Sequence, residues 1–404
     1  MFKKKFHNSI DKGRYGYLFI VPFFIVFAVF GLYPIVYTFI LSFQKWDGLA
    51  KMTPLGWKNY ARLLTDDVFY LSIWNTIRIW IFNFVPQMLT ALLLSALFTF
   101  NRIRGMKFFR AAYYLPNLIT AASVGLLFNL LFDGNKSVAN YILQALHVKG
   151  APFSFFNSGA FTSGMTSYIQ WWMWFGYTTV IVMAGITTIE GSVYDAAMVD
   201  GATKAQTFTK ITLPLIRPTL IYMTITSIIG GMQLFDVPTT LTNGTGDPNK
   251  SVLTTSMYLY NQGFKNFNYG YASTMSVGLQ FLVCLLSALC RVRRVLTMTN
   301  TVTNQKSQTS YKAQKIISNV IIYAFLIFLL LLSIVPFYLV VVNATHSSFD
   351  IVTKLNLLPG KNTLENYTTM QSRQHLARIP EQPLCSSTVY FLYGLFRRIY
   401  MLYI

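Results

Sequence analysis

The sequence is poor in charged residues and in cysteine. Charged side chains make up 11 % of the 404 residues, less than half of the roughly 25 % that is usual in soluble chains, so they cannot coat a globular body of this size. The three cysteines, Cys284, Cys290 and Cys385, have no CxxC or other metal-binding spacing and are too few for a disulfide framework. These shortages exclude a soluble enzyme and a disulfide-stabilised scaffold.

Groups that perform catalysis are also missing. The nearest approach to a phosphate-binding Walker A loop, Gly244–Ser251, has Asn249 where a second glycine must let the backbone approach a phosphate. The histidines are scattered and form no cluster with cysteine or carboxylate that could bind a metal or activate a nucleophile. They are His7, His147, His346 and His375. We therefore expect no enzyme activity and no bound cofactor or metal in this chain.

Long apolar runs are what the sequence has in abundance. Hydrophobic residues make up 53 % and aromatic residues 16 %, and a bilayer core about 30 Å thick requires a helix of roughly 20 mostly apolar residues. The runs are Tyr17–Leu41, Ile73–Phe98, Leu115–Phe132, Tyr168–Ile189, Thr219–Phe235, Ser273–Leu289 and Ile316–Val342. We predict an all-α polytopic membrane protein, with a six-helix bundle followed by one additional transmembrane helix.

The basic residues, 33 against 13 acidic ones, indicate how the chain crosses the membrane. If the N-terminus is cytoplasmic, the inner segments contain 18 basic and four acidic residues, and the outer segments between the first six runs contain eight basic and six acidic residues. Lys and Arg concentrate in cytoplasmic loops, so the bias predicts a multi-pass protein with a cytoplasmic N-terminus. Nucleic-acid binding is not expected, because no basic and aromatic module lies outside the apolar runs.

A weak internal repeat links the first and seventh runs. Each has a proline near its outer end, Pro34 or Pro336, and then a polar loop with an Asn-Tyr pair that begins at Asn59 or Asn366. Beyond residue 370 the pattern stops, and a frameshift is one interpretation of the tail. The predicted organisation is a cytoplasmic N-terminus 1–16, a six-helix domain 17–290 with an inner loop 190–218, a polar linker 291–315, a partial second domain 316–370 with one transmembrane helix, and an unassigned tail 371–404.

The inner loop 190–218 has the strongest local pattern. Between Tyr194 and Pro214 it predicts an amphipathic helix, a turn at Gly201 and a second short helix, since glycine permits the sharp turn that other residues resist. Small apolar side chains offer a face on which another protein could pack closely, namely Ala196, Ala197, Val199 and Ala202. A helix that merely lies on the membrane surface is the other interpretation.

This loop resembles the cytoplasmic loop of bacterial ABC-importer permeases, with its acidic-Ala-Ala, Asp-Gly-Ala and Ile-x-Leu-Pro elements. In that family the loop forms a coupling helix that docks into the ATP-hydrolysing subunit. The resemblance implies docking through Tyr194, Asp195, Ala196, Ala197, Asp200, Gly201, Ala202, Phe208, Ile211, Leu213 and Pro214. The family usually has glutamate where this chain has Asp195, so the charge is kept on a shorter side chain.

Other segments resemble the carbohydrate-importer branch of the maltose and multiple-sugar type, namely Gly56–Tyr60, Phe235–Gly244 and Phe264–Ser273. The resemblance implies a bacterial plasma-membrane permease subunit that translocates a sugar or oligosaccharide delivered by an extracytoplasmic binding protein. The other implied partners are a second permease, two copies of an ABC ATPase that hold ATP and Mg, and the lipid bilayer, with no nucleic acid. Residues 316–370 resemble the start of the partner permease. Polyols and glycerol phosphates are alternative cargoes.

Candidates for the substrate path lie on the fourth and fifth runs. They are Gln170, Trp174, Tyr177, Ser227, Gly231 and Gln233. The first three share one helical face, where amides and aromatic rings suit sugar hydroxyls and ring faces. An interfacial aromatic belt or core packing is the competing interpretation of the tryptophans, and Gly231 also suits a close helix contact. No charge lies deep in a run, which disfavours an ion-gradient-coupled carrier. That carrier and a degenerate, non-functional permease fusion remain the alternatives.

Overall fold

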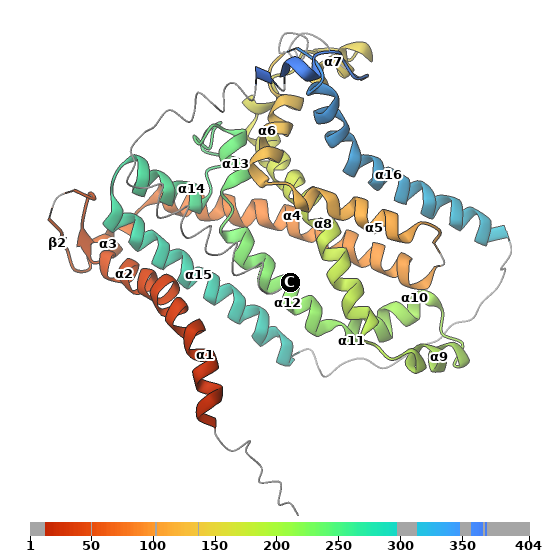
Figure 1. Cartoon of the computed structure of the whole chain (residues 1–404), viewed down its shortest axis with the longest axis horizontal. Helices are drawn as coiled ribbons and strands as arrows, with labels where there is room; N and C mark the ends of the chain where they lie inside the picture. Colours follow the sequence, from red (N-terminus) through yellow and green to blue (C-terminus); the bar gives the residue numbers. More distant parts are fainter. Residues whose placement is uncertain are drawn as a thin grey trace, which may run out of the picture.

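The computed structural model describes residues 13–49, 51–101, 103–135, 137–296, 313–347, 357–366, 368 and 369. Most of the predicted N-terminal segment 1–16, most of the linker 291–315 and the whole tail 371–404 lie outside the described residues. Within them, nearly all regular structure is helical (Figure 1). The exception is an antiparallel pair of short strands, β1 (Gln44–Lys45) and β2 (Thr53–Pro54).

Long helices make up the body of the fold. They are α1 (Gly13–Phe27), which continues through a π-helical turn (Ala28–Leu32) into α2 (Tyr33–Leu41), and α4 (Asp67–Phe100), α8 (Gly159–Thr187), α12 (Arg217–Met232), α15 (Tyr269–Leu296) and α16 (Ala313–Asn343). The shorter helices are α3 (Lys58–Leu64), α5 (Met106–Tyr114), α6 (Ala121–Phe132), α7 (Val138–Ala145), α9 (Gly191–Val199), α10 (Lys204–Gln206), α11 (Leu213–Leu215), α13 (Asp236–Leu241) and α14 (Thr255–Tyr260), with single 3-10 or π turns at 115–118, 155–157, 207–212 and 261–265. Every predicted run except the third lies along one of the long helices.

The third predicted run, Leu115–Phe132, is wrong as a single helix. α5 with its following turn meets α6 at an angle of 93°, because Pro116 begins a 3-10 turn and Thr120 is extended and caps α6 through its hydroxyl. α8 and α9 form a second bent pair at 76°. Among the described residues, five helices are long and apolar enough to cross a membrane, or up to seven if each bent pair is one span.

α8 lies at the centre of the fold and packs along α4 (Figure 1). On α8, Trp172, Phe175 and Val182 are completely buried. Polar side chains also join the two helices, because Gln87 of α4 donates a hydrogen bond of 2.6 Å to the Thr178 hydroxyl. Lipid provides no hydrophobic force between helices, so close packing and polar links of this kind hold such a pair together.

Candidate functional site

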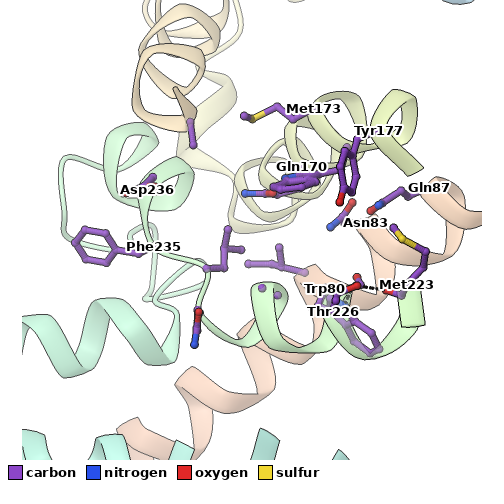
Figure 2. Close-up of a pocket in the computed structure, with 18 residues that line it drawn as sticks. Trp80, Asn83, Gln87, Gln170, Met173, Tyr177, Met223, Thr226, Phe235 and Asp236 are labelled. Atoms are coloured by element: carbon purple, nitrogen blue, oxygen red, sulfur yellow. Dashed lines mark hydrogen bonds between the residues drawn. The ribbon is translucent and has the colours of Figure 1, made fainter. Parts of the chain in front are cut away.

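A cavity of about 340 Å³ lies between α4, α8, α12 and the segment that joins α12 to α13 (Figure 2). Its volume is at the lower end of the range for small-molecule sites. All six substrate-path candidates line this one cavity, namely Gln170, Trp174, Tyr177, Ser227, Gly231 and Gln233. The structure therefore brings together residues that sequence reasoning selected on two separate helices, and their role in transport stays a prediction.

The sequence analysis does not predict the wall that α4 contributes. Trp80, Asn83 and Gln87 line the cavity, and their spacing of three and four residues places them on one face of the helix. Figure 2 shows Asn83 and Gln87 beside Tyr177. Two amides in an otherwise apolar run were the available signal, because polar side chains inside a membrane run are costly and tend to be functional.

Asn83 has a buried acceptor without a hydrogen-bond partner. Its side chain is 7 % exposed, and its Oδ1 accepts no hydrogen bond. By contrast, the amide of Gln87 already donates to Thr178. A buried acceptor without a partner costs about 1–3 kcal/mol.

The described cavity lining contains a negative side chain but no positive one. Asp236 is the single ionisable carboxylate among the described lining residues, and no Lys, Arg or His side chain contributes to that lining. The remaining polar groups are neutral, mainly the four amides of Asn83, Gln87, Gln170 and Gln233. Anionic ligands need cationic or backbone donors to offset their charge. The lining therefore suits neutral hydroxyl-rich molecules better than anions.

Gly231 serves both as a close contact between helices and as a cavity wall. A Cβ atom at this position would lie 2.1 Å from Cδ1 of Trp80, so only glycine allows α12 to approach α4 this closely. The indole of Trp80 then donates a hydrogen bond of 3.0 Å to the Ser227 hydroxyl on the same face of α12. The position of Gly231 thus agrees both with a close helix contact and with a place in the cavity wall, the two interpretations that the sequence left open.

The tryptophans of α8 divide between the cavity and the core. Trp174 is 40 % exposed and its ring meets Tyr177 edge-on, with centroids 5.6 Å apart. Trp172 is completely buried and donates a hydrogen bond to the Leu332 carbonyl, and Trp171 donates to the Thr90 hydroxyl. The complete burial of Trp172 agrees with the core-packing interpretation.

The loop 190–218 has the predicted helix, turn and second helix. α9 ends in a Schellman motif, in which the Ala202 amide donates to the Ala197 carbonyl and the Gly201 amide donates to the Met198 carbonyl. Gly201 has a φ of +73°, in the left-handed region that favours glycine. The chain then continues through α10, the π turn 207–212 and α11 into α12.

The exposed face of this loop differs from the predicted one. Ala197 is 6 % exposed and packs inside the loop, so the expectation that it forms part of an outer docking face is wrong. Ala196 and Val199 of the predicted face are exposed, Val199 at 88 %, and Met198, which was not predicted there, is exposed at 74 %.

The other predicted docking residues are distributed between the surface and the interior of the loop. Asp195, Ala196, Asp200, Gly201 and Pro214 are exposed. Half-buried positions hold Tyr194, Ala202, Phe208, Ile211 and Leu213. The hydroxyls of Tyr194 and Thr212 share a hydrogen bond of 3.2 Å that joins the two halves of the loop. These half-buried residues thus shape the loop rather than present a free surface.

The loop is anchored to a helix that lines the cavity. The Lys204 ammonium donates hydrogen bonds to the Phe100 carbonyl at 2.6 Å and to Asn101 Oδ1 at 3.1 Å, where the C-terminal end of α4 favours a positive charge. The ring of Phe100 also contacts Tyr194 and Phe208 edge-on. Since α8 precedes the loop and α12 follows it, the loop is joined to all three cavity helices.

The other end of α4 is fixed by a partly buried carboxylate network. Burial alone would raise the pKa of Asp66, but hydrogen bonds from the Tyr271 and Tyr258 hydroxyls and from the Phe69 and Val68 amides outweigh it and hold the pKa below its usual value. The tyrosine bonds are 2.5 and 2.8 Å long. Asp66 therefore caps α4 and ties it to α14 and α15. No group of three or more His, Cys, Asp or Glu that could hold a metal occurs in the described part of the chain.

Comparison with known proteins assigns most of the chain to one group. Residues 70–345 match the family described as binding-protein-dependent transport system inner membrane component. The lactose transport system permease protein LacF of Rhizobium radiobacter is 34 % identical over 279 residues, which are 68 % of this chain and 92 % of that protein. The arabinooligosaccharides transport system permease protein AraP of Bacillus subtilis (strain 168) is 30 % identical over 274 residues, 68 % of this chain and 86 % of that protein.

Solved structures show the same fold. A chain from a bacterial ABC transporter involved in the import of the acidic polysaccharide alginate superposes with a TM-score of 0.59 at 20 % identity, covering 72 % of this chain and 98 % of that one. A chain of the alginate transporter in complex with an alginate pentasaccharide-bound periplasmic protein superposes with a TM-score of 0.58 at 21 % identity, covering 74 % and 100 %.

Proposed function

The chain belongs to the family of binding-protein-dependent transport system inner membrane components, as its resemblance to ABC-importer permeases implies, and we propose that it imports a neutral sugar or short oligosaccharide. It is an inner-membrane protein with several membrane-spanning helices. The observation that carries the proposal is the amide- and aromatic-lined cavity whose three helices meet at one anchored loop. Relatives named for lactose and arabinooligosaccharide transport support a sugar as cargo.

The lining supplies what sugar recognition requires. Amides can donate to and accept from hydroxyls at the same time, and the side chains of Asn83, Gln87, Gln170 and Gln233 bring four of them to the lining. Trp174 and Tyr177 provide apolar ring surface for the carbon face of a pyranose. Because Asp236 repels anions and the described lining holds no cation, a uronic acid or a glycerol phosphate is a poor cargo. The solved neighbour involved in alginate import handles an acidic polysaccharide, so the two cargo classes differ.

Energy comes from a separate subunit. With the N-terminus in the cytoplasm, the loop 190–218 faces the ATPase, which we propose is present in two copies that hold ATP and Mg, so that this chain is not itself an enzyme. Met198 and Val199, with Asp195 beside them, form the docking surface. Two adjacent exposed apolar side chains on a polar loop suit a protein interface. The loop 190–218 is called the coupling loop below.

Movement of the coupling loop is transmitted to the cavity through fixed contacts. Lys204 holds the end of α4, and α12 begins two residues after α11 ends. A displaced loop therefore shifts α4, α8 and α12 as rigid elements and opens the cavity to one side or the other, which is a two-state change of packed helices.

An extracytoplasmic binding protein delivers the sugar. Residues 17–290 form the permease domain, and a second permease forms the other half of the translocation path.

The test is uptake into proteoliposomes that contain the complete importer. We expect accumulation of a labelled neutral disaccharide to require ATP and the binding protein, and to persist when the proton gradient is dissipated. A galacturonide at the same concentration should not compete. Asp236→Asn should weaken that discrimination by removing the repelling charge. Uptake that continues without ATP and stops when the proton gradient is lost would instead establish an ion-coupled carrier.

A further inference from the structure

A second cavity, of about 620 Å³, lies between α4 and α8. The residues that line it belong to segments 78–86 of α4 and 160–171 of α8, and we call it the lateral groove. Ile79 lines both this groove and the sugar cavity, so the two hollows use different faces of the same helix pair. Phe82 is 65 % exposed, and Gly164 is exposed as well. The lateral groove therefore opens to the side of the bundle, where a membrane protein meets lipid.

Arg78 is the one charged side chain among the described residues that line the lateral groove. It is half-buried, and its Nη2 donates a hydrogen bond of 3.0 Å to the Ser251 carbonyl. Within the described part of the chain the guanidinium forms no ion pair with a carboxylate. A cation in a membrane-spanning helix is costly and generally pairs with an opposite charge or with carbonyl groups. One carbonyl uses only one of the several N–H donors of an arginine and leaves its charge unbalanced.

Other polar side chains of the lateral groove bond within the chain. The Ser167 hydroxyl lies 3.2 Å from the Ile79 carbonyl and 3.0 Å from the Ser163 carbonyl, and it donates to them. The Trp171 indole donates to the Thr90 hydroxyl. An occupant of the lateral groove therefore meets a mostly apolar surface, with one unbalanced positive charge at the position of residue 78.

This charge lies toward the end of the bundle that is opposite the coupling loop. Ser251, the partner of Arg78, belongs to the predicted outer segment 236–272. A Cβ atom on Gly159, the first residue of α8, would lie 2.8 Å from the Ser251 side chain, so α8 begins at the same level. The coupling loop instead holds the other end of α4 through Lys204. The 34 residues of α4 extend about 51 Å, well beyond a core about 30 Å thick, which places Arg78 close to the level of the lipid headgroups.

The length of the lateral groove matches one leaflet of a bilayer. At a rise of about 1.5 Å per residue, the step from Arg78 to Pro86 covers about 12 Å along α4. The step from Ala160 to Trp171 covers about 17 Å along α8. Half of the hydrocarbon core is about 15 Å. The apolar part of the lateral groove is thus as long as one leaflet is deep, and its charge is at the headgroup end.

We propose that the lateral groove is the seat of one anionic phospholipid in the leaflet at the Ser251 end of the bundle. Its phosphate meets the Arg78 guanidinium, whose planar set of donors matches phosphate oxygens. One acyl chain lies along Phe82 and Gly164. A zwitterionic lipid carries its own ammonium group and balances the arginine less well, and a small soluble anion leaves the apolar length empty. The lipid would lie against the same two helices that line the sugar cavity.

Lipid titration of the full chain in a mild detergent, read by native mass spectrometry, tests the role of the charge. Delipidated protein receives phosphatidylglycerol or phosphatidylcholine with identical palmitoyl and oleoyl chains. We expect the first phosphatidylglycerol to bind about tenfold more tightly than phosphatidylcholine. Arg78→Gln should abolish most of that preference, and Arg78→Lys should retain part of it because the charge is kept. Lys149→Gln, which removes an exposed charge in the predicted outer segment 133–167, is the matched control and should behave as the wild type.

A second pair of variants covers the case in which Arg78→Gln disturbs the segment around Ser251. A Cβ atom on Gly164 would meet nothing within 4 Å, so a larger side chain enters the lateral groove without striking the protein. Gly164→Leu should weaken the binding of both lipids several-fold. Gly164→Ala adds a single methyl group and should bind lipid nearly as the wild type does. Both residues favour a helix more than glycine does, so thermal unfolding in detergent should show no loss of stability.

Equal affinity of the wild-type chain for the two lipids, a preference that survives Arg78→Gln, or unchanged binding by Gly164→Leu would overturn the proposal. Displacement of phosphatidylglycerol by millimolar glycerol phosphate would overturn it too, because the site would then bind a soluble anion. If assembly of the complete importer expels the bound phosphatidylglycerol, a protein subunit covers the lateral groove instead. The affinity measurements need no sugar and no ATP, so their failure would leave the proposed function intact.

Discussion

The cavity and the coupling loop are built from opposite distributions of polar and apolar groups. In the cavity, polar amides such as Asn83 and Gln87 are buried, at 7 % and 4 % exposure, inside a membrane-spanning bundle. On the coupling loop, Met198 and Val199 expose most of their apolar surface on a segment rich in polar residues. Each arrangement costs free energy in the isolated chain.

The contrast indicates what each region binds. Amides that line a cavity suit a small molecule that carries hydroxyl groups, whereas apolar side chains on the surface suit contact with another protein. The two regions are rigidly connected through Lys204 at the end of α4. Binding at one region can therefore displace the other through α4, without a separate signalling element. Three substitutions test how far the contrast between the two regions holds.

The largest effect is expected at the coupling loop. The double substitution Met198→Asp and Val199→Asp removes two apolar contacts, each worth roughly 1.5–3 kcal/mol when buried, and places two charges in the interface. We expect at least a hundredfold weaker association with the ATPase in a pull-down, and loss of uptake. Leu146→Asp, which is also at an exposed apolar residue but in the outer segment, is the control and should keep the ATPase. Unchanged association in the double variant would show that this face does not dock.

An intermediate effect is expected in the cavity. Asn83→Leu removes the buried, unpartnered Oδ1, so the folded protein should be as stable as the wild type or more stable. The apparent affinity for sugar in uptake assays should fall about tenfold, because the lining loses the Asn83 amide as a hydrogen-bond donor to the ligand. Ser333→Ala is the matched control, because its Oγ is likewise buried and unpartnered but lies on α16. That variant should gain stability with no change in uptake. Normal uptake by Asn83→Leu would place the sugar elsewhere.

The smallest effect is expected on α12, where two neighbouring glycines distinguish close helix packing from simple exposure to the cavity. Gly231→Ala drives a methyl group into Trp80 and should cost about 1–3 kcal/mol of stability, with lower uptake because the cavity wall moves. Gly230→Ala has nothing within 4 Å of its added Cβ and should stabilise the helix by up to about 1 kcal/mol. Thermal unfolding in detergent measures both. If the two alanine variants unfold at the same temperature, the close approach of α12 to α4 is wrong.

The sequence predicts this protein well where the pattern is local. The apolar runs lie along helices, the helix–turn–helix of the coupling loop is present, and the repeated asparagines, Asn59 and Asn366, each donate two hydrogen bonds to backbone carbonyls after a helix. It fails at the third run, where Pro116 and Thr120 break an apolar segment into two helices at 93°. Apolar composition alone does not distinguish a straight span from a bent one.

The site residues follow the same division. Gln170, Trp174 and Tyr177 could be selected from their spacing on one helix, but Asn83 could not be joined to them, because it lies on another helix whose rotation is set by packing. Ala197 was misplaced for a related reason, since its burial depends on how the loop packs and not on its position along α9. A helical face becomes inner or outer only when its neighbours are in place.

The sequence by itself therefore determined the class of the protein. Scarce charge, apolar runs, basic inner segments and the coupling-loop motif are sufficient for a membrane permease of the family it belongs to. Only the tertiary structure decided which polar groups share a cavity, which apolar residues remain outside, and how the Tyr113 hydroxyl and the Trp172 indole hold the backbone of α16. The reason is that burial and unsatisfied hydrogen bonding are properties of packed helices, and a periodic pattern in one helix does not contain them.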